Sequence, residues 1–135
     1  MEINELIICP NCKNNLKIED GKYLCSNCNS SYEITSNIPV LISLHNTLEN
    51  LSQKNLAEYF DSKYEKDEDP WNYESSAAEK MKYEFVTKLV KELNPNIQTV
   101  LDVACSFGYL SNKLSNISEN VVGIDVSLSV LMNAT

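Results

Sequence analysis

The chain contains no arginine, because all 11 of its basic residues are lysines, and it has only three glycines and one histidine. Arginine is the residue that pairs bidentately with carboxylates and phosphates, so its absence removes the usual clamp for these groups. The 19 acidic residues give a net charge of −8, and an acidic surface repels phosphate backbones. The composition therefore disfavours stand-alone binding to nucleic acid.

Long uncharged apolar runs are also missing. A membrane-spanning helix needs about 20 consecutive apolar residues, and no stretch of the sequence approaches that length. The first eight residues carry two glutamates where an export signal has basic and then apolar residues. We therefore expect a cytoplasmic protein with no membrane partner. A chain of 135 residues is long enough for one ordinary domain or two small ones.

Four of the five cysteines form two C-x-x-C pairs, Cys9 with Cys12 and Cys25 with Cys28. Two such turns can place four sulfurs around one tetrahedral ion. The segment between the pairs reads as two strands around an Asp-Gly turn, which is the pattern of a hairpin. We expect a structural zinc ion, because four thiolates leave no open coordination position. Disulfides, a redox pair and an iron–sulfur centre are the alternatives.

Strand-like residues follow the second cysteine pair, first 31–35 and then the apolar segment 37–42. With the cysteine pairs, they resemble the small zinc-ribbon family that includes activator subunits of tRNA methyltransferases. The same ribbon occurs fused ahead of methyltransferase domains. The resemblance implies an α+β zinc ribbon over residues 1–45 that presents a β surface to a partner or a neighbouring domain. A folding module without activity is the alternative, and we interpret His45 as linker surface rather than a ligand.

Residues 46–94 carry two helical patterns with a charged run between them. Apolar residues in 48–60 approximate a first helical stripe. A second helix is predicted from Ser76, which forms a capping box with Glu79, to Leu93. The apolar stripe expected to pack inward on this helix is Ala78, Met81, Phe85, Leu89 and Leu93, widened by Val86 and Val90.

The stretch 99–125 reads as strand, small-residue turn, helix and strand, which is one βαβ unit. An acidic residue closes each strand, Asp102 in the first and Asp125 after the second. Apolar residues at helical spacing lie between them, from Leu110 to Ile117. Ligands of open α/β sheets bind at the carboxyl ends of strands, where an acid can accept hydrogen bonds from ribose hydroxyls. The pattern therefore predicts a cofactor that contains a nucleoside.

The turn of this unit, residues 102–108, has the pattern D-x-A-x-S-x-G with a single glycine. A dinucleotide fold would carry G-x-G-x-x-G, and other α/β ligands are a further alternative. The turn resembles motif I of class I S-adenosylmethionine-dependent methyltransferases, usually D-x-G-x-G-x-G, and VVGIDVS resembles the segment that follows it. The resemblance implies S-adenosyl-L-methionine as cofactor, bound by Asp102, Ala104, Cys105, Ser106, Gly108, Asp125 and Val126.

The same resemblance assigns roles within this set. Asp102 helps to position the methionine part of the cofactor, the backbone of residues 104–108 wraps it, and Asp125 holds the ribose. We interpret Cys105 as a small side chain that fills a tight turn, with a reactive thiol as the alternative.

A D-P-W sequence at residues 69–71 precedes the second helix. It resembles the region before motif I in small-molecule methyltransferases of the nodulation protein S type, where this segment forms a lid over the cofactor pocket. Trp71, Tyr73 and Tyr83 are therefore candidates for the pocket wall, although large aromatic residues are also common core anchors.

Ten uncharged residues follow Asp125, whereas a doubly wound sheet needs several more strands. We therefore expect residues 46–135 to form a helical lid and the first βαβ unit of a partial Rossmann-like α/β fold, in a truncated chain. Association through the incomplete sheet is an alternative. The expected activity is methyl transfer to an unidentified small molecule, with catalytic residues unknown. A non-catalytic zinc-ribbon activator that docks onto a separate methyltransferase subunit is the alternative function.

Overall fold

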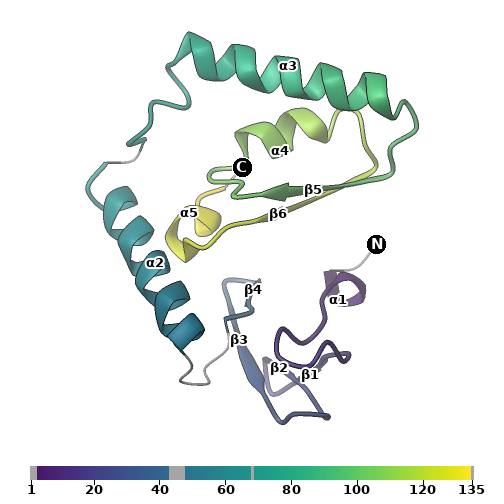
Figure 1. Cartoon of the computed structure of the whole chain (residues 1–135), viewed down its shortest axis with the longest axis vertical. Helices are drawn as coiled ribbons and strands as arrows, with labels where there is room; N and C mark the ends of the chain where they lie inside the picture. The colour runs from purple at the N-terminus through teal and green to yellow at the C-terminus, as the bar shows by residue number, and fades with distance from the viewer. Residues whose placement is uncertain (1–2, 43–47, 68, 135) are drawn as a thin grey trace. The chain divides into compact units, whose positions relative to one another are not determined.

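The computed structural model describes residues 3–42, 48–67 and 69–134 of a mixed α/β chain (Figure 1). The chain divides into two compact units, Met1–Leu56 and Ala57–Thr135. The predicted domain boundary after residue 45 stays a prediction, and His45 lies outside the described residues. None of the helices in the described ranges has the length and hydropathy needed to cross a membrane.

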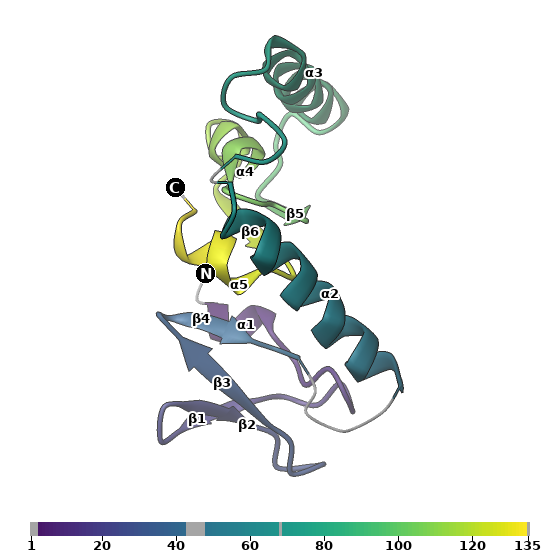
Figure 2. The same ribbon diagram turned by 90° about the vertical axis from the view of Figure 1, so that its left-hand side faces the viewer.

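The first unit contains a four-stranded antiparallel sheet in the order β1-β2-β3-β4 (Figure 2). The predicted hairpin is confirmed, since Asp20 and Gly21 connect β1 and β2 with positive φ angles of 48° and 74°, as a type I′ turn requires. The elements of this unit are α1 (Ile3–Leu6), β1 (Lys17–Glu19), β2 (Lys22–Leu24), β3 (Ser31–Thr35) and β4 (Ile38–Val40).

The core of the first unit is small and includes its cysteines. Cys9, Tyr23, Cys25 and Tyr32 are buried together, and the two tyrosines are cross-strand partners on β2 and β3. A unit of this size buries little apolar surface, so an additional source of stability is needed to keep it folded.

The second unit is built around two parallel strands, β5 (Thr99–Val103) and β6 (Asn120–Ile124). Helix α4 (Tyr109–Leu114) joins them and lies between the strands and α3 (Ala77–Leu93), as Figures 1 and 2 both show. The predicted strand–helix–strand unit is therefore confirmed. The remaining helices are α2 (Leu48–Tyr64), whose residues from Ala57 onward belong to this unit, and α5 (Leu128–Met132).

Local signals account for the ends of α3 and α4. The Ser76 side chain caps α3 by accepting a hydrogen bond from the Glu79 backbone N–H at 3.4 Å, and Asn94 follows the last helical residue. Helix α4 ends at Leu114, so the helical pattern predicted as far as Ile117 is too long. The chain turns there, with the Ile117 N–H bonded to the Leu114 carbonyl.

The face of α3 that packs inward differs from the prediction. Tyr83 is buried and Val86 is half-buried. The predicted stripe lies exposed instead: Ala78, Met81, Phe85, Leu89 and Leu93. Helix α3 has apolar residues on two faces, so periodicity alone does not decide which face is covered.

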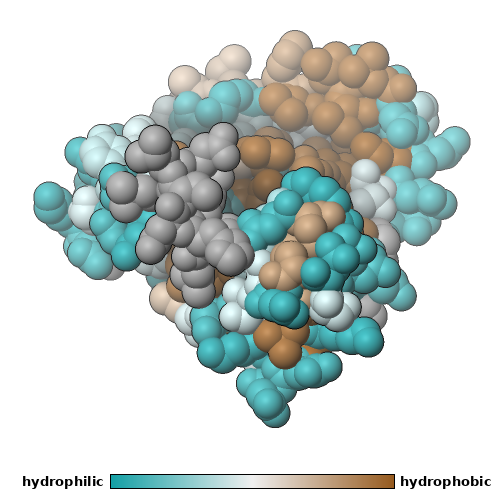
Figure 3. All heavy atoms as spheres, turned by 60° about the horizontal axis from the view of Figure 1, so that its bottom comes forward, coloured by the Kyte–Doolittle hydropathy of each residue, from teal (hydrophilic) through white to brown (hydrophobic). Residues whose placement is uncertain are grey.

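One face of the β5–β6 sheet is also open. Side chains alternate along a strand, and Asp102 is buried toward α4 whereas its neighbours Leu101 and Val103 are exposed, as is Ile124 on β6. Figure 3 shows that hydrophobic residues, drawn in brown, gather in parts of the visible surface.

Candidate functional site

The turn after β5 has an unusual backbone. Ala104, Ser106 and Gly108 have positive φ angles of 60°, 50° and 82°, a region that side chains with a Cβ rarely adopt. These are the three positions at which the methyltransferase motif usually has glycine. The turn therefore keeps the conformation of a glycine-rich loop, although two of its glycines are replaced by small residues.

A glycine on β6 makes room for this turn. A Cβ on Gly123 would lie 2.8 Å from the Cys105 Sγ, which is closer than packed atoms approach, and 3.2 Å from the Cys105 Cβ. The Cys105 N–H also continues the strand pairing by donating to the Ile124 carbonyl at 3.1 Å. The end of β6 thus holds the turn after β5 tightly.

Asp125 connects the two strand ends. Its Oδ2 accepts a hydrogen bond from the Ser106 N–H at 2.9 Å, and its Oδ1 accepts one from the Ser127 N–H at 3.0 Å. A carboxylate has about four acceptor positions, so two of them stay available to a ligand. Asp125 also lines a cavity.

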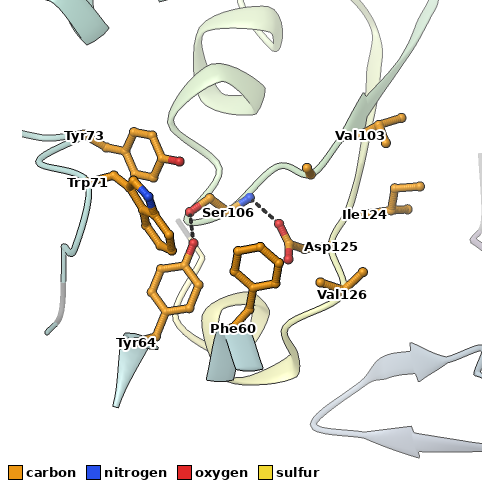
Figure 4. Close-up of a pocket in the computed structure, with 10 residues that line it drawn as sticks. Phe60, Tyr64, Trp71, Tyr73, Val103, Ser106, Ile124, Asp125 and Val126 are labelled. Atoms are coloured by element: carbon orange, nitrogen blue, oxygen red, sulfur yellow. Dashed lines mark hydrogen bonds between the residues drawn. The ribbon is translucent and has the colours of Figure 1, made fainter. Parts of the chain in front are cut away.

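This cavity has a volume of about 450 Å³ and lies where the two parallel strands end, within the size range of small-molecule sites. Figure 4 shows Val103, Ile124 and Val126 on the side of the strands, with aromatic rings on the other side. The full lining is Phe60, Tyr64, Trp71, Tyr73, Val103, Ala104, Ser106, Ile124, Asp125 and Val126.

The aromatic wall is a chain of touching rings. The ring centroid of Trp71 lies 5.3 Å from that of Tyr64 and 6.0 Å from that of Tyr73, within the range of favourable aromatic pairs. Asp69 shapes this segment, because its carboxylate accepts hydrogen bonds from the N–H groups of Tyr73 and Glu74 at 2.8 and 3.0 Å. Burial raises the pKa of Tyr64 and of Tyr73, so both phenols are neutral at physiological pH.

The cavity brings together some of the predicted cofactor residues. Ala104, Ser106, Asp125 and Val126 line it. The roles of the whole predicted set stay predictions.

Three other members of the set are not among the residues that line this cavity. Asp102 is buried and accepts a hydrogen bond from the Ser111 hydroxyl at 2.6 Å, and Gly108 begins α4. Cys105 is buried, and burial, with the nearby Asp125 and Asp102 carboxylates, raises the pKa of its thiol to about 11. A thiol with this pKa is not reactive, which agrees with its interpretation as a space-filling residue.

Two of the three aromatic candidates for the pocket wall lie at the cavity, and the role of their segment as a lid stays a prediction. Trp71 and Tyr73 line the cavity, whereas Tyr83 is absent from its lining and is buried on α3. Sequence reasoning missed Phe60 and Tyr64 of α2 as pocket residues. Phe60 is the last residue of the first helical stripe, but nothing in that pattern marks it as a pocket residue, and Tyr64 lies beyond the stripe.

The first unit contains a second candidate site. The Sγ atoms of Cys9, Cys12, Cys25 and Cys28 all lie within 4.8 Å of one another, and the cysteines are free thiols. The Cys9–Cys28 and Cys12–Cys25 sulfur separations are 3.5 and 3.4 Å. Sulfurs bound tetrahedrally at about 2.3 Å from one ion are about 3.8 Å apart. The four cysteines are therefore placed to hold a metal ion.

The two cysteine turns have the same backbone geometry. The Lys13 N–H donates to the Cys9 carbonyl at 2.8 Å, and the Asn29 N–H donates to the Cys25 carbonyl at 2.9 Å. Both Lys13 and Asn29 are left-handed, with φ angles of 63° and 56°. Asparagine tolerates this conformation better than most residues, whereas a lysine such as Lys13 gives no sequence signal for it.

Polar groups surround the sulfurs. The Tyr32 hydroxyl lies 3.2 Å from the Cys9 Sγ, and the Ser30 hydroxyl lies 3.1 Å from the Cys28 Sγ. The Asn14 backbone N–H lowers the pKa of the Cys12 thiol to about 6. Hydrogen-bond donors of this kind stabilise thiolates, which are the form that binds metals.

Comparison with known proteins places the second unit in a family. No curated protein matches the sequence. Residues 52–134, which include the D-P-W segment, the turn after β5 and Asp125, match the sequence model of the family described as Nodulation protein S (NodS). The match covers more than half of the chain. The chain therefore belongs to the nodulation protein S family, a family of S-adenosylmethionine-dependent methyltransferases.

Proposed function

We propose that the second unit binds S-adenosyl-L-methionine in the cavity at the strand ends and transfers its methyl group to a small molecule. The observation that carries the proposal is the Asp125 carboxylate, which borders a cavity of about 450 Å³ at the carboxyl ends of β5 and β6. This is the edge of an open α/β sheet at which ligands bind. The family membership supports the same cofactor.

The polar and apolar groups of the cavity suit the parts of this cofactor. Asp125 has free acceptor capacity for two ribose hydroxyls, in addition to the two backbone N–H groups that it already holds. Val103, Ile124 and Val126 offer an apolar surface for the adenine ring. The backbone of the turn after β5 approaches the cavity closely at Ala104 and Ser106, where small side chains leave it accessible.

The chemistry requires little covalent help from the protein. When bound, S-adenosylmethionine supplies a methyl group on a positively charged sulfur, and in-line transfer depends on positioning of donor and acceptor. The aromatic residues Tyr64, Trp71 and Tyr73 line the cavity, and aromatic rings attract cations. We assign no general base, and the methyl acceptor is left open.

Isothermal titration with S-adenosylmethionine tests the proposal. We expect saturable one-to-one binding by the full chain, and at least tenfold weaker binding by Asp125→Ala. Circular dichroism of the variant controls for folding. NAD serves as the control ligand, because a dinucleotide site would bind NAD instead. A folded chain that binds no S-adenosylmethionine would favour the alternative of a docking protein without cofactor.

For the first unit we propose a zinc ribbon whose four cysteines hold one structural zinc ion. The sulfur separations support a tetrahedral site, and a set of four thiolates leaves no position for a substrate. Metal analysis of the purified chain should find one zinc per chain. Substitution by cobalt should give the absorption bands of tetrahedral cobalt–thiolate coordination, whereas an iron–sulfur centre would be coloured as isolated.

The partners, the cytoplasmic location and the truncated state stay predictions. Zinc ribbons of the type that the sequence resembles present a β surface to a neighbouring domain or a partner. Docking of this unit onto a separate methyltransferase subunit is the second candidate role, and it is compatible with cofactor binding by the second unit.

A further inference from the structure

The last turn of α2 is bonded to the chain segment that follows Asp125. The Oδ1 atom of Asp61 accepts hydrogen bonds from the Ser127 hydroxyl at 2.5 Å, the Ser129 hydroxyl at 2.8 Å and the Ser129 N–H at 3.3 Å. Ser127 is completely buried. One carboxylate oxygen of α2 therefore holds three donors of a segment more than 60 positions away in the sequence.

A second bond joins the same helix turn to the loop after β5. Tyr64 lies three positions after Asp61, on the same side of the helix, and its hydroxyl is 2.9 Å from the Ser106 hydroxyl (Figure 4). The backbone N–H groups of Ser106 and Ser127 are the two donors to the Asp125 carboxylate. Helix α2 therefore holds three serines, Ser106, Ser127 and Ser129, and the first two of them are the residues that fix Asp125.

We infer that Asp61 is a positioning residue for the adenosyl-ligand site, and that Asp61 and Tyr64 together clamp α2 onto the two loops that orient Asp125. This inference rests on the proposed function. Asp61 itself is not part of the cavity lining, whereas its neighbours on the helix, Phe60 and Tyr64, are. The clamp therefore fixes the position of the Asp125 carboxylate relative to the aromatic wall of the cavity.

The clamp makes ligand binding and α2 docking interdependent. A ligand held by Asp125 and by the aromatic wall favours the docked helix, and a docked helix favours the ligand, because such a coupling is reciprocal. Amide hydrogens of residues 57–64 should therefore exchange more slowly when the ligand is bound. Asp61→Ala should remove this effect, because the helix end is then no longer tied to Ser127 and Ser129.

The test compares variants of the full chain with S-adenosylhomocysteine as the probe. Asp61→Ala removes the acceptor, and we expect at least a tenfold loss of affinity. Ser129→Ala removes one side-chain donor, with an expected loss of a few fold. Ser62→Ala is the matched control on the same helix turn, because within the described residues its hydroxyl bonds only the Tyr59 carbonyl, and its affinity should stay within twofold of the wild type.

Asp61→Asn keeps an acceptor oxygen, so we expect it to recover part of the affinity that Asp61→Ala loses. This variant and Ser129→Ala carry the test if Asp61→Ala does not fold. The inference is wrong if folded Asp61 and Ser129 variants bind the probe within twofold of the wild type and show the same slowing of exchange in residues 57–64. The proposed function would not be affected by that result. A wild-type chain that does not bind the probe would overturn the proposed function first.

Discussion

Three residues with left-handed backbone shape the turn after β5, and only one of them is glycine. Ala104 and Ser106 have a Cβ in a conformation that costs such residues about 1–2 kcal/mol. The surrounding contacts tolerate this strain, since the Ser106 N–H bonds Asp125 and its hydroxyl bonds Tyr64. Ser106 thus gives the loop a side-chain contact that glycine would lack.

Replacing Ala104 by glycine should stabilise the second unit by about 0.5–1 kcal/mol, because glycine adopts a positive φ without strain. Ala78→Gly is the matched control, since Ala78 lies exposed within α3 and glycine in a helix costs about 1 kcal/mol. Urea denaturation followed by circular dichroism measures both changes. Equal losses of stability in the two variants would contradict the strained turn.

The Tyr32 hydroxyl beside Cys9 should tighten metal binding by donating to the bound thiolate. Tyr32→Phe removes only this donor, and we expect about tenfold weaker zinc binding, in the range found for groups that support metal ligands. Tyr23→Phe is the control, because Tyr23 is its buried cross-strand partner but bonds Asn4 rather than a sulfur. Competition with a chromophoric chelator gives the affinities. The same affinity in both variants would exclude a role for the Tyr32 hydroxyl.

At the scale of elements, helix α3 shows where sequence patterns decide the structure and where they do not. Its start at Ser76 and its end before Asn94 follow from local capping, and both could be predicted. The buried face could not, because apolar residues lie on two sides of the helix and tertiary packing selects one.

Substitutions on the two faces of α3 should differ in effect. Tyr83→Ala removes a buried ring and should lower the free energy of unfolding by about 3 kcal/mol. Phe85→Ala removes a ring that is 66% exposed, so we expect a change below about 0.5 kcal/mol. Thermal and urea denaturation of the two variants provide the comparison. A larger loss for Phe85→Ala would mean that the other face of α3 is covered.

The candidate site could also be predicted only in part, because sequence patterns show local features and not contacts between distant segments. Asp125 and the turn after β5 stand in one short stretch with a recognisable pattern. The contribution of α2 depends on hydrogen bonds between residues 42 and 66 positions apart, Tyr64 with Ser106 and Asp61 with Ser127. No local pattern encodes such pairs, so Asp61 and Tyr64 emerged only from the structure.

At the scale of the whole molecule, the two units have separate cores. The first is organised around Cys9, Cys25 and two tyrosines, and because this unit is small, the proposed metal ion would be its main source of stability. The second unit has its own parallel strands and cavity. Loss of metal should therefore affect the units unequally.

Removal of the metal with a chelator should unfold residues 3–42 and leave cofactor binding intact. Hydrogen exchange would show loss of protection in the first unit, with unchanged protection of β5 and β6. The affinity for S-adenosylhomocysteine should stay within twofold of its value before chelation. Simultaneous loss of structure in both units would contradict separate cores.

The most direct test of the central claim uses the fluorescence of Trp71, the only tryptophan of the chain and part of the cavity wall. Titration with S-adenosylhomocysteine should change its emission saturably, with the same dissociation constant that calorimetry gives. Binding heat without any change in emission would place the ligand outside this cavity. The absence of both signals from a folded chain would contradict an adenosyl-ligand site at the ends of β5 and β6.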